Sequence, residues 1–309
     1  MRIVFMGSPA LAVPSLKAAM ETGQVVGIVT QPPKMSGRGR KMTPSPVSDE
    51  AAGMGIRILT PESLKNPEVE EEFKSMAPDI AVVVAYGKIL PPGILTIPRL
   101  GCVNVHASIL PELRGAAPIQ WAIARGYTET GVTLMQMDEG MDTGPILLQS
   151  KTPIRDQETA GDLGKRLADM GADLVRNGLP LLERGEVTPV EQDGSRATYA
   201  PLLKKSDGFI DWSLGADEIA NRVRGFRPWP GTWTTMAGNR LIVVKAIALE
   251  KPSGDRPGAV ITADASGLSV SCGRGTLEIL AVKPDGKREM NVQEFISGHK
   301  INIGEILGL

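Results

Sequence analysis

The chain has 309 residues, with 34 Lys and Arg against 35 Asp and Glu, and its formal net charge is −1. This length is ample for two domains and for a large core that needs no disulfide or metal. The near-zero charge excludes a generally polybasic nucleic-acid binder, so any contact with nucleic acid must come from a local basic cluster.

The cysteine content and the hydrophobic runs indicate which cellular compartment the protein occupies. Cys102 and Cys272 are too few and too far apart for a disulfide framework, and they match no zinc-binding spacing. Residues 2–6 predict a first strand rather than a signal peptide. No stretch approaches the roughly 18 consecutive apolar residues of a membrane span. We therefore expect a cytoplasmic protein with no metal and no membrane association.

The first half of the chain alternates between apolar runs of strand length and longer helical stretches. The expected strands are residues 2–6, 25–30, 56–59, 79–85, 101–106, 132–137 and 146–150, the last two as a hairpin. The expected helices are residues 11–20, 61–76, 118–125 and 159–184. The 79–85 run is nearly all apolar, which is typical of a parallel strand buried on both faces. This alternation predicts an α/β fold around a mainly parallel sheet.

The pattern changes after residue 185. Residues 190–206 show no clear period and are interpreted as a linker between a first domain, 1–189, and a C-terminal domain, 207–309. The C-terminal domain is expected to hold one helix, at 216–224, and short strands at 241–249, 258–261, 268–272 and 277–282. Several short strands separated by Gly, Pro and Asp predict a small β-barrel or sandwich.

Two glycine-containing turns lack the patterns of nucleotide sites. Gly7-Ser8-Pro9 follows the first strand, but Pro9 and Ala12 stand where a dinucleotide-binding fingerprint has glycine. No acidic residue ends the second strand to bind a ribose, so NAD binding is disfavoured. The string at 37–41 lacks the P-loop spacing as well.

The segment Asn104-Val105-His106 is the most informative part of the sequence. Side chains alternate along a strand, so Asn104 and His106 point to one face and Val105 to the other. They lie at the C-terminal end of a strand, where open α/β sheets bind ligands. If an imidazole acts as an acid or base, His106 is the candidate, because the other histidine, His299, lies in a polar C-terminal stretch. A partly buried structural histidine is the alternative.

A second polar element, Asp138-Glu139-Gly140-Met141-Asp142-Thr143-Gly144-Pro145, follows the 132–137 strand. Its glycines and proline indicate a tight, irregular loop. One of its acids can reach His106 and hold the imidazole charged. We choose Asp142, although the spacing alone does not prefer it over Asp138, and turn formation is the commoner use of such acids.

The loop from residue 31 to residue 46, QPPKMSGRGRKMTPSP, carries Lys34, Arg38, Arg40 and Lys41 and no acidic residue. Its glycines and prolines disfavour a stable helix or strand. Its length exceeds that of most connections. A long basic loop near the end of a strand favours contact with phosphate or nucleic acid, and a solvated insertion is the alternative.

These motifs together resemble the folate-dependent formyltransferases. The resemblance covers essentially the whole chain, including TQPPKMSGRGRKMTPSPV, LGCVNVHASILPELRGAAPIQWAI, ETGVTLMQMDEGMDTG and FRPWPGTW. The Asn-x-His and Ser-x-Leu-Pro run indicates formyl transfer as a class, while GRGRK, PSPV and AAPIQ point to an enzyme that acts on tRNA. Ile109 stands where leucine is more usual.

The resemblance implies a Rossmann-like N-terminal domain and a smaller C-terminal β-barrel of oligonucleotide-binding type that contacts tRNA. It implies transfer of the formyl group of 10-formyltetrahydrofolate to the amino group of methionyl initiator tRNA. We expect the protein to act as a monomer. It also assigns residues by role: Asn104, His106 and Asp142 to catalysis, Ser108, Ile109, Leu110 and Pro111 to folate binding, and Arg38, Arg40 and Lys41 to tRNA binding. Asn104 and a protonated His106 would donate hydrogen bonds to the formyl oxygen as negative charge develops there.

Other functions remain open from the sequence. A formyltransferase acting on an amino sugar nucleotide shares the core but has less need of a long basic loop. A glycinamide ribonucleotide formyltransferase would end near residue 190, and a formyltetrahydrofolate hydrolase would use water as acceptor. A non-catalytic RNA-binding protein would leave Asn104, His106 and Asp142 unexplained.

Overall fold

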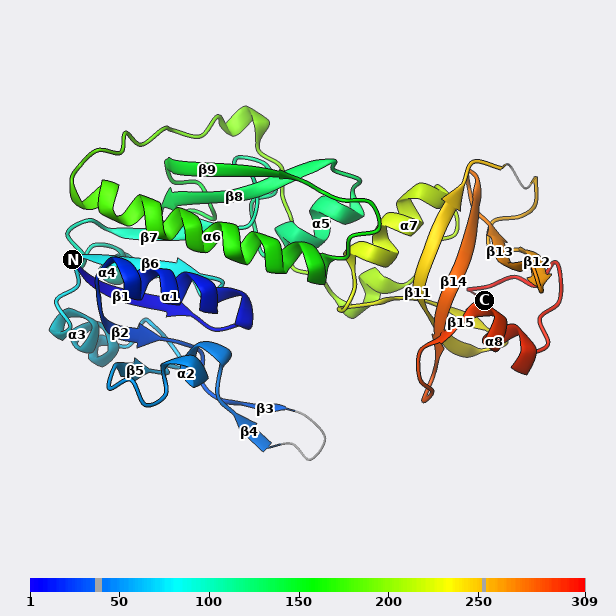
Figure 1. The fold of residues 1–309 in the computed structure, drawn as a ribbon, viewed down its shortest axis with the longest axis horizontal. Coiled ribbons are helices and arrows are strands. Elements are labelled where there is room, and N and C mark those ends of the chain that lie inside the picture. Colours follow the sequence, from blue (N-terminus) through cyan, green and yellow to red (C-terminus); the bar gives the residue numbers. More distant parts are fainter. Residues whose placement is uncertain (37–40, 252–253, 309) are drawn as a thin grey trace. The chain divides into compact units, whose positions relative to one another are not determined.

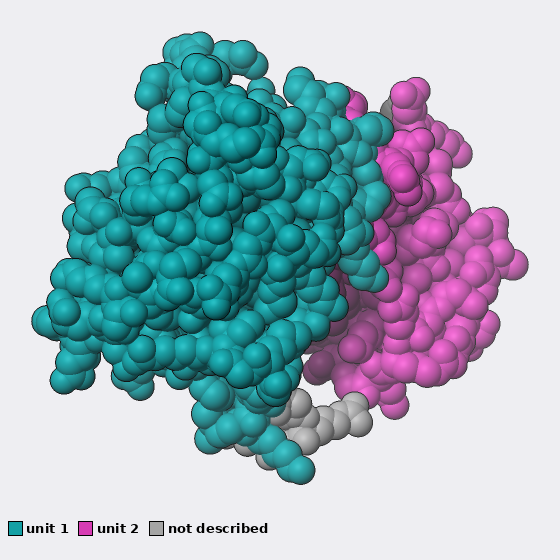
Figure 2. Space-filling view, turned by 60° about the vertical axis from the view of Figure 1, so that its left-hand side comes forward, with its two compact units in different colours: residues 1–118, 129–153, 164–200 teal, residues 119–128, 154–163, 201–309 magenta. Residues whose placement is uncertain are grey.

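The chain folds into two compact units in a computed structural model that describes residues 1–36, 41–251 and 254–308 (Figure 1). Unit 1 consists of residues 1–118, 129–153 and 164–200, and unit 2 of residues 119–128, 154–163 and 201–309. Figure 2 shows the two units in different colours. Each unit thus combines segments that are separated along the chain.

Unit 1 is built on a seven-stranded sheet in the order β5-β2-β1-β6-β7-β8-β9. Its strands are β1 (Arg2–Gly7), β2 (Gln24–Val29), β5 (Arg57–Leu59), β6 (Ile80–Val84), β7 (Cys102–His106), β8 (Glu129–Gln136) and β9 (Ile146–Pro153). The first five are mutually parallel, and β8 and β9 are antiparallel to their neighbours. The predicted α/β fold with a mainly parallel sheet is confirmed, as is the hairpin of β8 with β9.

Helices cover both faces of this sheet. They are α1 (Val13–Thr22), α2 (Pro46–Ala51), α3 (Pro67–Ser75), α4 (Pro92–Leu95) and α6 (Ala160–Glu183), with a 3₁₀ turn at Ala10–Ala12. Figure 1 shows α1 and α6 in front of the strands. On the opposite face Ala81, Val83 and Cys102 join a buried cluster with Phe73 of α3 and Ile94 of α4. All five residues of β6 are buried, which explains the uninterrupted apolar run predicted there.

The basic loop contains regular structure that the sequence did not predict. β3 (Lys34–Ser36) and β4 (Lys41–Thr43) form a short antiparallel hairpin, with Met35 opposite Met42. The expectation that strands are unlikely here was wrong. The prolines at 32, 33 and 44 flank the two strands without entering them, so they remove no hydrogen bond from the ladder.

Unit 2 contains an antiparallel sheet in the order β10-β11-β14-β13-β12, with β15 paired to β14. Its elements are α5 (Pro118–Ala124), α7 (Ala216–Gly225), α8 (Val292–Gly298), β10 (Thr232–Met236), β11 (Asn239–Leu249), β12 (Val260–Asp264), β13 (Gly267–Ser271), β14 (Thr276–Pro284) and β15 (Met290–Asn291). Trp212, Ile219 of α7 and Phe295 of α8 share one buried cluster with the inward residues of the strands. The predicted strand-rich C-terminal domain is confirmed, while β10, β15 and α8 were not predicted.

Two segments from the middle of the chain pack within unit 2. The Trp121 indole of α5 meets the Phe226 ring edge-on, with ring centroids 5.5 Å apart. A Cβ on Gly225 would stand 2.9 Å from the backbone nitrogen of Ala124, so a glycine is required for this close approach. Residues after position 200 therefore pack against residues that lie much earlier in the chain.

Candidate active site

The strand β7 presents Asn104 and His106 on the face of the sheet that also holds Cys102. β7 lies between β6, to which it is parallel, and β8, to which it is antiparallel. Cys102 packs in the cluster of α3 and α4, and alternation places Asn104 and His106 on that same side. Burial raises the pKa of the Cys102 thiol to about 12, so this thiol stays protonated and serves packing.

The two polar side chains on β7 differ in their hydrogen-bond partners. The half-buried Asn104 amide makes no hydrogen bond to any part of the chain that the structure describes. His106 is 5 % exposed, and its Nε2 lies 3.0 Å from the backbone oxygen of Leu113. A carbonyl oxygen only accepts, so Nε2 carries the proton and Nδ1 is the ring nitrogen left for other partners.

Asp142 is the acid that faces this free nitrogen. Its Oδ2 lies 3.6 Å from His106 Nδ1 and accepts a hydrogen bond of 2.7 Å from the Gly115 N–H. The distance to Nδ1 is longer than an N–H···O hydrogen bond. The two form an ion pair only when His106 is protonated. Asp138, which the spacing did not distinguish from Asp142, instead accepts from Thr143 and Gly140 and holds the turn.

The direction of β8 determines how Asp142 reaches His106. Because β8 is antiparallel to β7, it ends beside Val103, at the start of β7. The loop that follows begins with the Met137 N–H donating to the Cys102 oxygen at 2.8 Å, and its Asp142 faces His106 at the far end of β7. The structure thus brings Asp142 to the strand that carries the other two residues assigned to catalysis.

The turn after β7 is held by neighbouring strands. Thr133 of β8 donates from Oγ1 to the Ser108 oxygen at 2.7 Å, and Gln149 of β9 donates to the Leu110 oxygen at 2.9 Å. Ser108 is fully buried, and its hydroxyl donates to the Glu112 oxygen at 2.6 Å. Leu110 and Pro111 are buried too, and Ile109 is half-buried. Most of the 108–111 stretch therefore shapes the loop.

The segment that the sequence predicts to begin the linker contacts these loops closely. Val190 pairs with Ile146 through two backbone hydrogen bonds of 2.8 and 2.9 Å. The Leu113 N–H donates to Thr198 Oγ1 at 2.8 Å, and Gln192 bonds to the loops on either side. Sequence reasoning missed Gln192 and Thr198, because no periodicity marks them and these partners lie 48 to 85 residues away.

The three basic residues assigned to tRNA belong to the hairpin segment. Lys41 lies on β4 and is exposed, as are Met35 and Met42. Arg38 and Arg40 lie outside the described residues. Figure 1 shows β3 and β4 projecting from the body of unit 1. At their base Thr30 Oγ1 bonds to Ser45 Oγ at 2.6 Å and donates to Ser8 Oγ at 3.2 Å.

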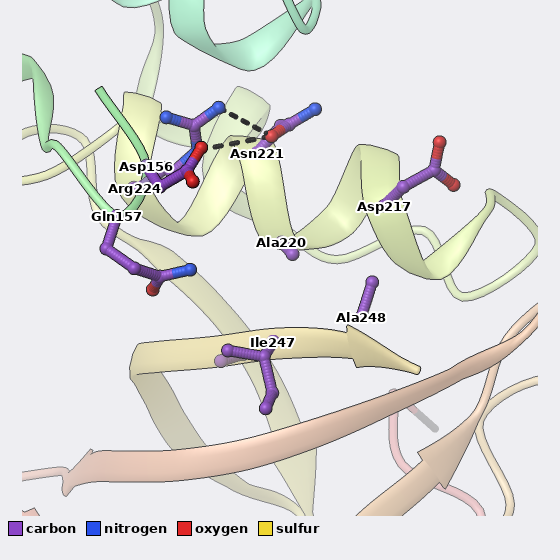
Figure 3. A pocket seen from close by; sticks show the side chains of 9 residues that line it. Asp156, Gln157, Asp217, Ala220, Asn221, Arg224, Ile247 and Ala248 are labelled. Carbon is purple, nitrogen blue, oxygen red and sulfur yellow. Dashed lines mark hydrogen bonds between the residues drawn. The ribbon is translucent and has the colours of Figure 1, made fainter. Parts of the chain in front are cut away.

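Unit 2 has a pocket of its own between α7, β11 and the 154–163 segment (Figure 3). Arg224 donates from Nε and Nη2 to Asn221 Oδ1 at 3.1 and 2.9 Å. Burial lowers the pKa of Arg224, against the raising effect of the Asp156 and Glu158 carboxylates. The two carboxylates therefore offset only part of the cost of burying the Arg224 cation.

The described residues contain neither a cluster of metal-binding side chains nor a membrane-spanning helix. No group of three His, Cys, Asp or Glu side chains there is arranged to hold a metal ion. No helix in the same residues is long and apolar enough to span a bilayer.

The sequence matches two family models that together span most of the chain. Residues 1–177 match the model described as formyl transferase, and residues 202–300 match that of the formyl transferase C-terminal domain. The methionyl-tRNA formyltransferase of Myxococcus xanthus is 46 % identical over 303 residues, covering 98 % of this chain and 96 % of that protein. The enzyme of the same name from Caldanaerobacter subterraneus is 47 % identical over 309 residues, covering 99 % and 100 %.

Solved structures share the fold at low identity. A sugar 3N-formyl transferase superimposes with a TM-score of 0.68 at 18 % identity, covering 93 % of this chain and 99 % of that chain. The methionyl-tRNA formyltransferase of Clostridium thermocellum gives 0.53 at 19 % identity, covering 81 % and 94 %. The family models account for most of the sequence, and relatives above 45 % identity span nearly all of it. This chain belongs to the formyl transferase family.

Proposed function

We propose that this protein transfers the formyl group of 10-formyltetrahydrofolate to the free amino group of methionyl initiator tRNA. One observation carries the proposal: relatives named methionyl-tRNA formyltransferase match this chain at 46 and 47 % identity over nearly its whole length. The arrangement of Asn104, His106 and Asp142 supports formyl transfer as the chemistry. The reaction is part of translation initiation and belongs in the cytoplasm.

The residues on β7 fit a formyl oxygen. In the reaction the neutral amine attacks the formyl carbon, a new C–N bond forms, and the bond to the folate nitrogen breaks. The free Asn104 amide donates to the oxygen on which negative charge grows, and His106 donates from Nδ1, since Nε2 is engaged by Leu113. The amine loses a proton and the leaving folate nitrogen gains one, so the overall transfer needs no net acid or base.

Asp142 has two roles in this scheme. As an anion near Nδ1 it forms an ion pair with the ring when the imidazole is protonated, and a protonated ring is the stronger donor. Its carboxylate can also accept the proton of the attacking amine, directly or through water. The 3.6 Å separation supports both roles, because Nδ1–H is not tied up in a short bond to the carboxylate and remains available to the formyl oxygen.

The substrate contacts follow the same assignment. Ser108, Ile109, Leu110 and Pro111 form the folate-binding stretch, with Ile109 as its half-exposed side chain and Ser108 holding the turn from within. Arg38, Arg40 and Lys41 contact the phosphates of the acceptor tRNA. The C-terminal domain, 207–309, provides further tRNA contact. The protein acts as a monomer.

A formyl-transfer assay with competing acceptors tests the proposal. The protein is mixed with 10-formyltetrahydrofolate carrying a labelled formyl group, and with methionyl initiator tRNA, methionyl elongator tRNA or an amino sugar nucleotide. We expect label on the initiator tRNA and little on the other two. Label on the sugar nucleotide alone, or tRNA binding without transfer to any acceptor, overturns it. N104A is the control that shows that the transfer comes from this site.

A further inference from the structure

Gln192 links the two loops that meet at the candidate active site. Its Nε2 donates to the backbone oxygens of Asp142 at 2.9 Å and Gly144 at 2.7 Å. Its Oε1 accepts from Nε and Nη2 of Arg114 at 3.1 and 2.8 Å. A glutamine side chain has two donor hydrogens and two acceptor lone pairs, so all of its hydrogen-bonding capacity is used. The flanking residues, Glu191 and Asp193, are exposed, while Gln192 is half-buried.

The partners of Gln192 are themselves in contact with the catalytic residues. Arg114 stands between Leu113, whose oxygen binds His106 Nε2, and Gly115, whose N–H donates to the Asp142 carboxylate. Three consecutive residues therefore bond to the imidazole, to Gln192 and to Asp142. Because Gln192 in turn bonds to the Asp142 main chain, the hydrogen bonds close a ring through the two loops, and Asp142, which faces His106, is part of that ring.

The backbone of the two loops shows why such a ring is needed. Asp142 has φ of +55° and Leu113 has φ of +60°, both in the left-handed region that non-glycine residues rarely adopt. Such conformations persist where surrounding contacts over-determine them. Asp142 is held at both ends, since Gln192 binds its main-chain oxygen and the Gly115 N–H binds its carboxylate.

We propose that Gln192 is a positioning residue that holds Asp142 at the distance from His106 which formyl transfer requires. This inference rests on the proposed function. Gln192 acts through Asp142 and touches no substrate. The buried Arg114, which is 6 % exposed, fixes the acceptor end of the Gln192 amide so that its donor end points at the 142 and 144 carbonyls.

The test separates hydrogen-bond donation from the filling of space. Q192E keeps the length and the acceptor atoms that Arg114 binds, but its carboxylate cannot donate and faces two carbonyl oxygens. We expect kcat to fall about 10- to 100-fold, because a misplacement of a catalytic group by about 1 Å can cost about 100-fold in rate. The KM values for tRNA and folate should change less than about threefold, because uniform binding is retained.

The neighbouring residue supplies a matched control. D193N exchanges a carboxylate for an amide at a side chain whose partners are the N–H and hydroxyl of Ser195, in an exposed turn. We expect its kcat to stay within about twofold of wild type. Wild-type kcat in Q192E overturns the proposal. Glutamate has the same shape as glutamine, so unchanged turnover would mean that Gln192 only fills space. If Q192E fails to fold, Q192A, which adds no charge, takes its place, and wild-type kcat in Q192A overturns the proposal.

A double-mutant cycle tests whether Gln192 acts through Asp142. If it does, Q192E in the D142N background lowers kcat little beyond D142N alone, because the carboxylate being positioned is already gone. Multiplicative losses in the double variant overturn the proposal, because they mean that Gln192 affects the reaction by another route.

A spectroscopic readout distinguishes this inference from the proposed function. The chain has two histidines, so the ring signals of His106 can be assigned in NMR spectra with the H299Q variant. At a fixed pH, Q192E should shift the His106 ring signals and D193N should leave them unchanged. Wild type that transfers no formyl group refutes the proposed function, whereas unchanged His106 signals in Q192E refute the positioning role.

Discussion

Two carboxylates next to the same sheet have nearly the same kinds of partner and different geometry. Asp79, before β6, accepts from the Arg2 N–H at 2.6 Å and from Arg99 Nε at 2.8 Å. Asp142 accepts from the Gly115 N–H at 2.7 Å, but its basic partner, His106, stays 3.6 Å away. Asp79 and Arg99 are joined by a hydrogen bond, while Asp142 and His106 are too far apart for one. The geometry at Asp79 is that of a carboxylate satisfied by its partners, and the geometry at Asp142 leaves His106 Nδ1 without a short bond, as the proposed function requires.

The largest expected effect is on turnover, which should fall in variants next to Asp142 and stay unchanged in a variant of Asp79. H106A or N104A should lower formyl transfer by about 10²- to 10³-fold, because each removes one donor to the developing negative charge. Fold and tRNA binding should be largely retained. The measurements are steady-state formylation, circular dichroism and filter binding of tRNA. D79N, by contrast, should keep full turnover, and near wild-type activity in either site variant would contradict the assignment.

Gly115 lies in the hydrogen-bonded ring, and replacing it tests whether the position of its backbone N–H, which binds Asp142, affects turnover. Gly115 has φ of +115°, and a Cβ there would stand 2.7 Å from the Ala200 oxygen. G115A should reduce the free energy of unfolding by about 1–3 kcal/mol. It should lower turnover by about tenfold or more, because the N–H that holds Asp142 is displaced. Denaturant unfolding and kcat are the measurements.

Gly185 is the matched control, with φ of +68° and no atom within 4 Å of the position that a Cβ would take. G185A carries the backbone cost alone, about 1–2 kcal/mol, and should leave kcat unchanged. Equal losses of turnover in G115A and G185A would show that general destabilisation, rather than displacement of Asp142, lowers the rate.

The basic hairpin should affect acceptor binding and leave the chemistry alone. Neutralising Arg40 and Lys41 together should raise KM for tRNA several-fold with KM for folate unchanged. The slope of log KM against log salt should fall by about 0.7–0.9 for each phosphate that is no longer neutralised. K74A is the control, because Lys74 is already paired at 2.9 Å with both Glu70 and Glu71. An unchanged salt slope in the double variant would remove the hairpin from the tRNA interface.

The smallest effect concerns Asp79 alone. The Arg2 N–H, and next the Arg99 guanidinium, lower the pKa of this carboxyl group below its ordinary value. Its contribution to stability is therefore present above the ordinary pKa and is lost as the pH falls through the lowered one. D79N should be less stable than wild type by about 1 kcal/mol at neutral pH. Denaturant unfolding should show this difference shrinking in acid, and a constant difference would contradict the linkage.

The sequence predicted the elements whose pattern is set by burial on both sides. β6 appears as expected because apolar residues fill both faces of a parallel strand, and α6 because its helical period extends over 24 residues. The short helices α2 and α4 were missed, since each begins at a proline and has too few residues to show a helical period.

The site was predicted as far as local rules extend. Strand alternation placed Asn104 and His106 on one face, but spacing could not choose between Asp138 and Asp142, because the choice depends on how the loop turns back along β7. Gln192 and Thr198 lay beyond prediction for a similar reason. Their partners lie 48 to 85 residues earlier in the chain, and only the tertiary fold brings them near.

The division of the chain into units limits where it can be joined to part of a relative to make a chimera. Residues 119–128 and 154–163 pack in unit 2 although unit 1 residues surround them in sequence, and residues up to 200 complete unit 1. A single crossover after the N-terminal family match, at residue 177, would discard Gln192 and Thr198. A crossover placed after residue 200 would keep Trp121 but replace Phe226, which it contacts, with the residue of the relative. Replacement of the C-terminal part of this chain by that of a relative therefore demands compensating changes in α5.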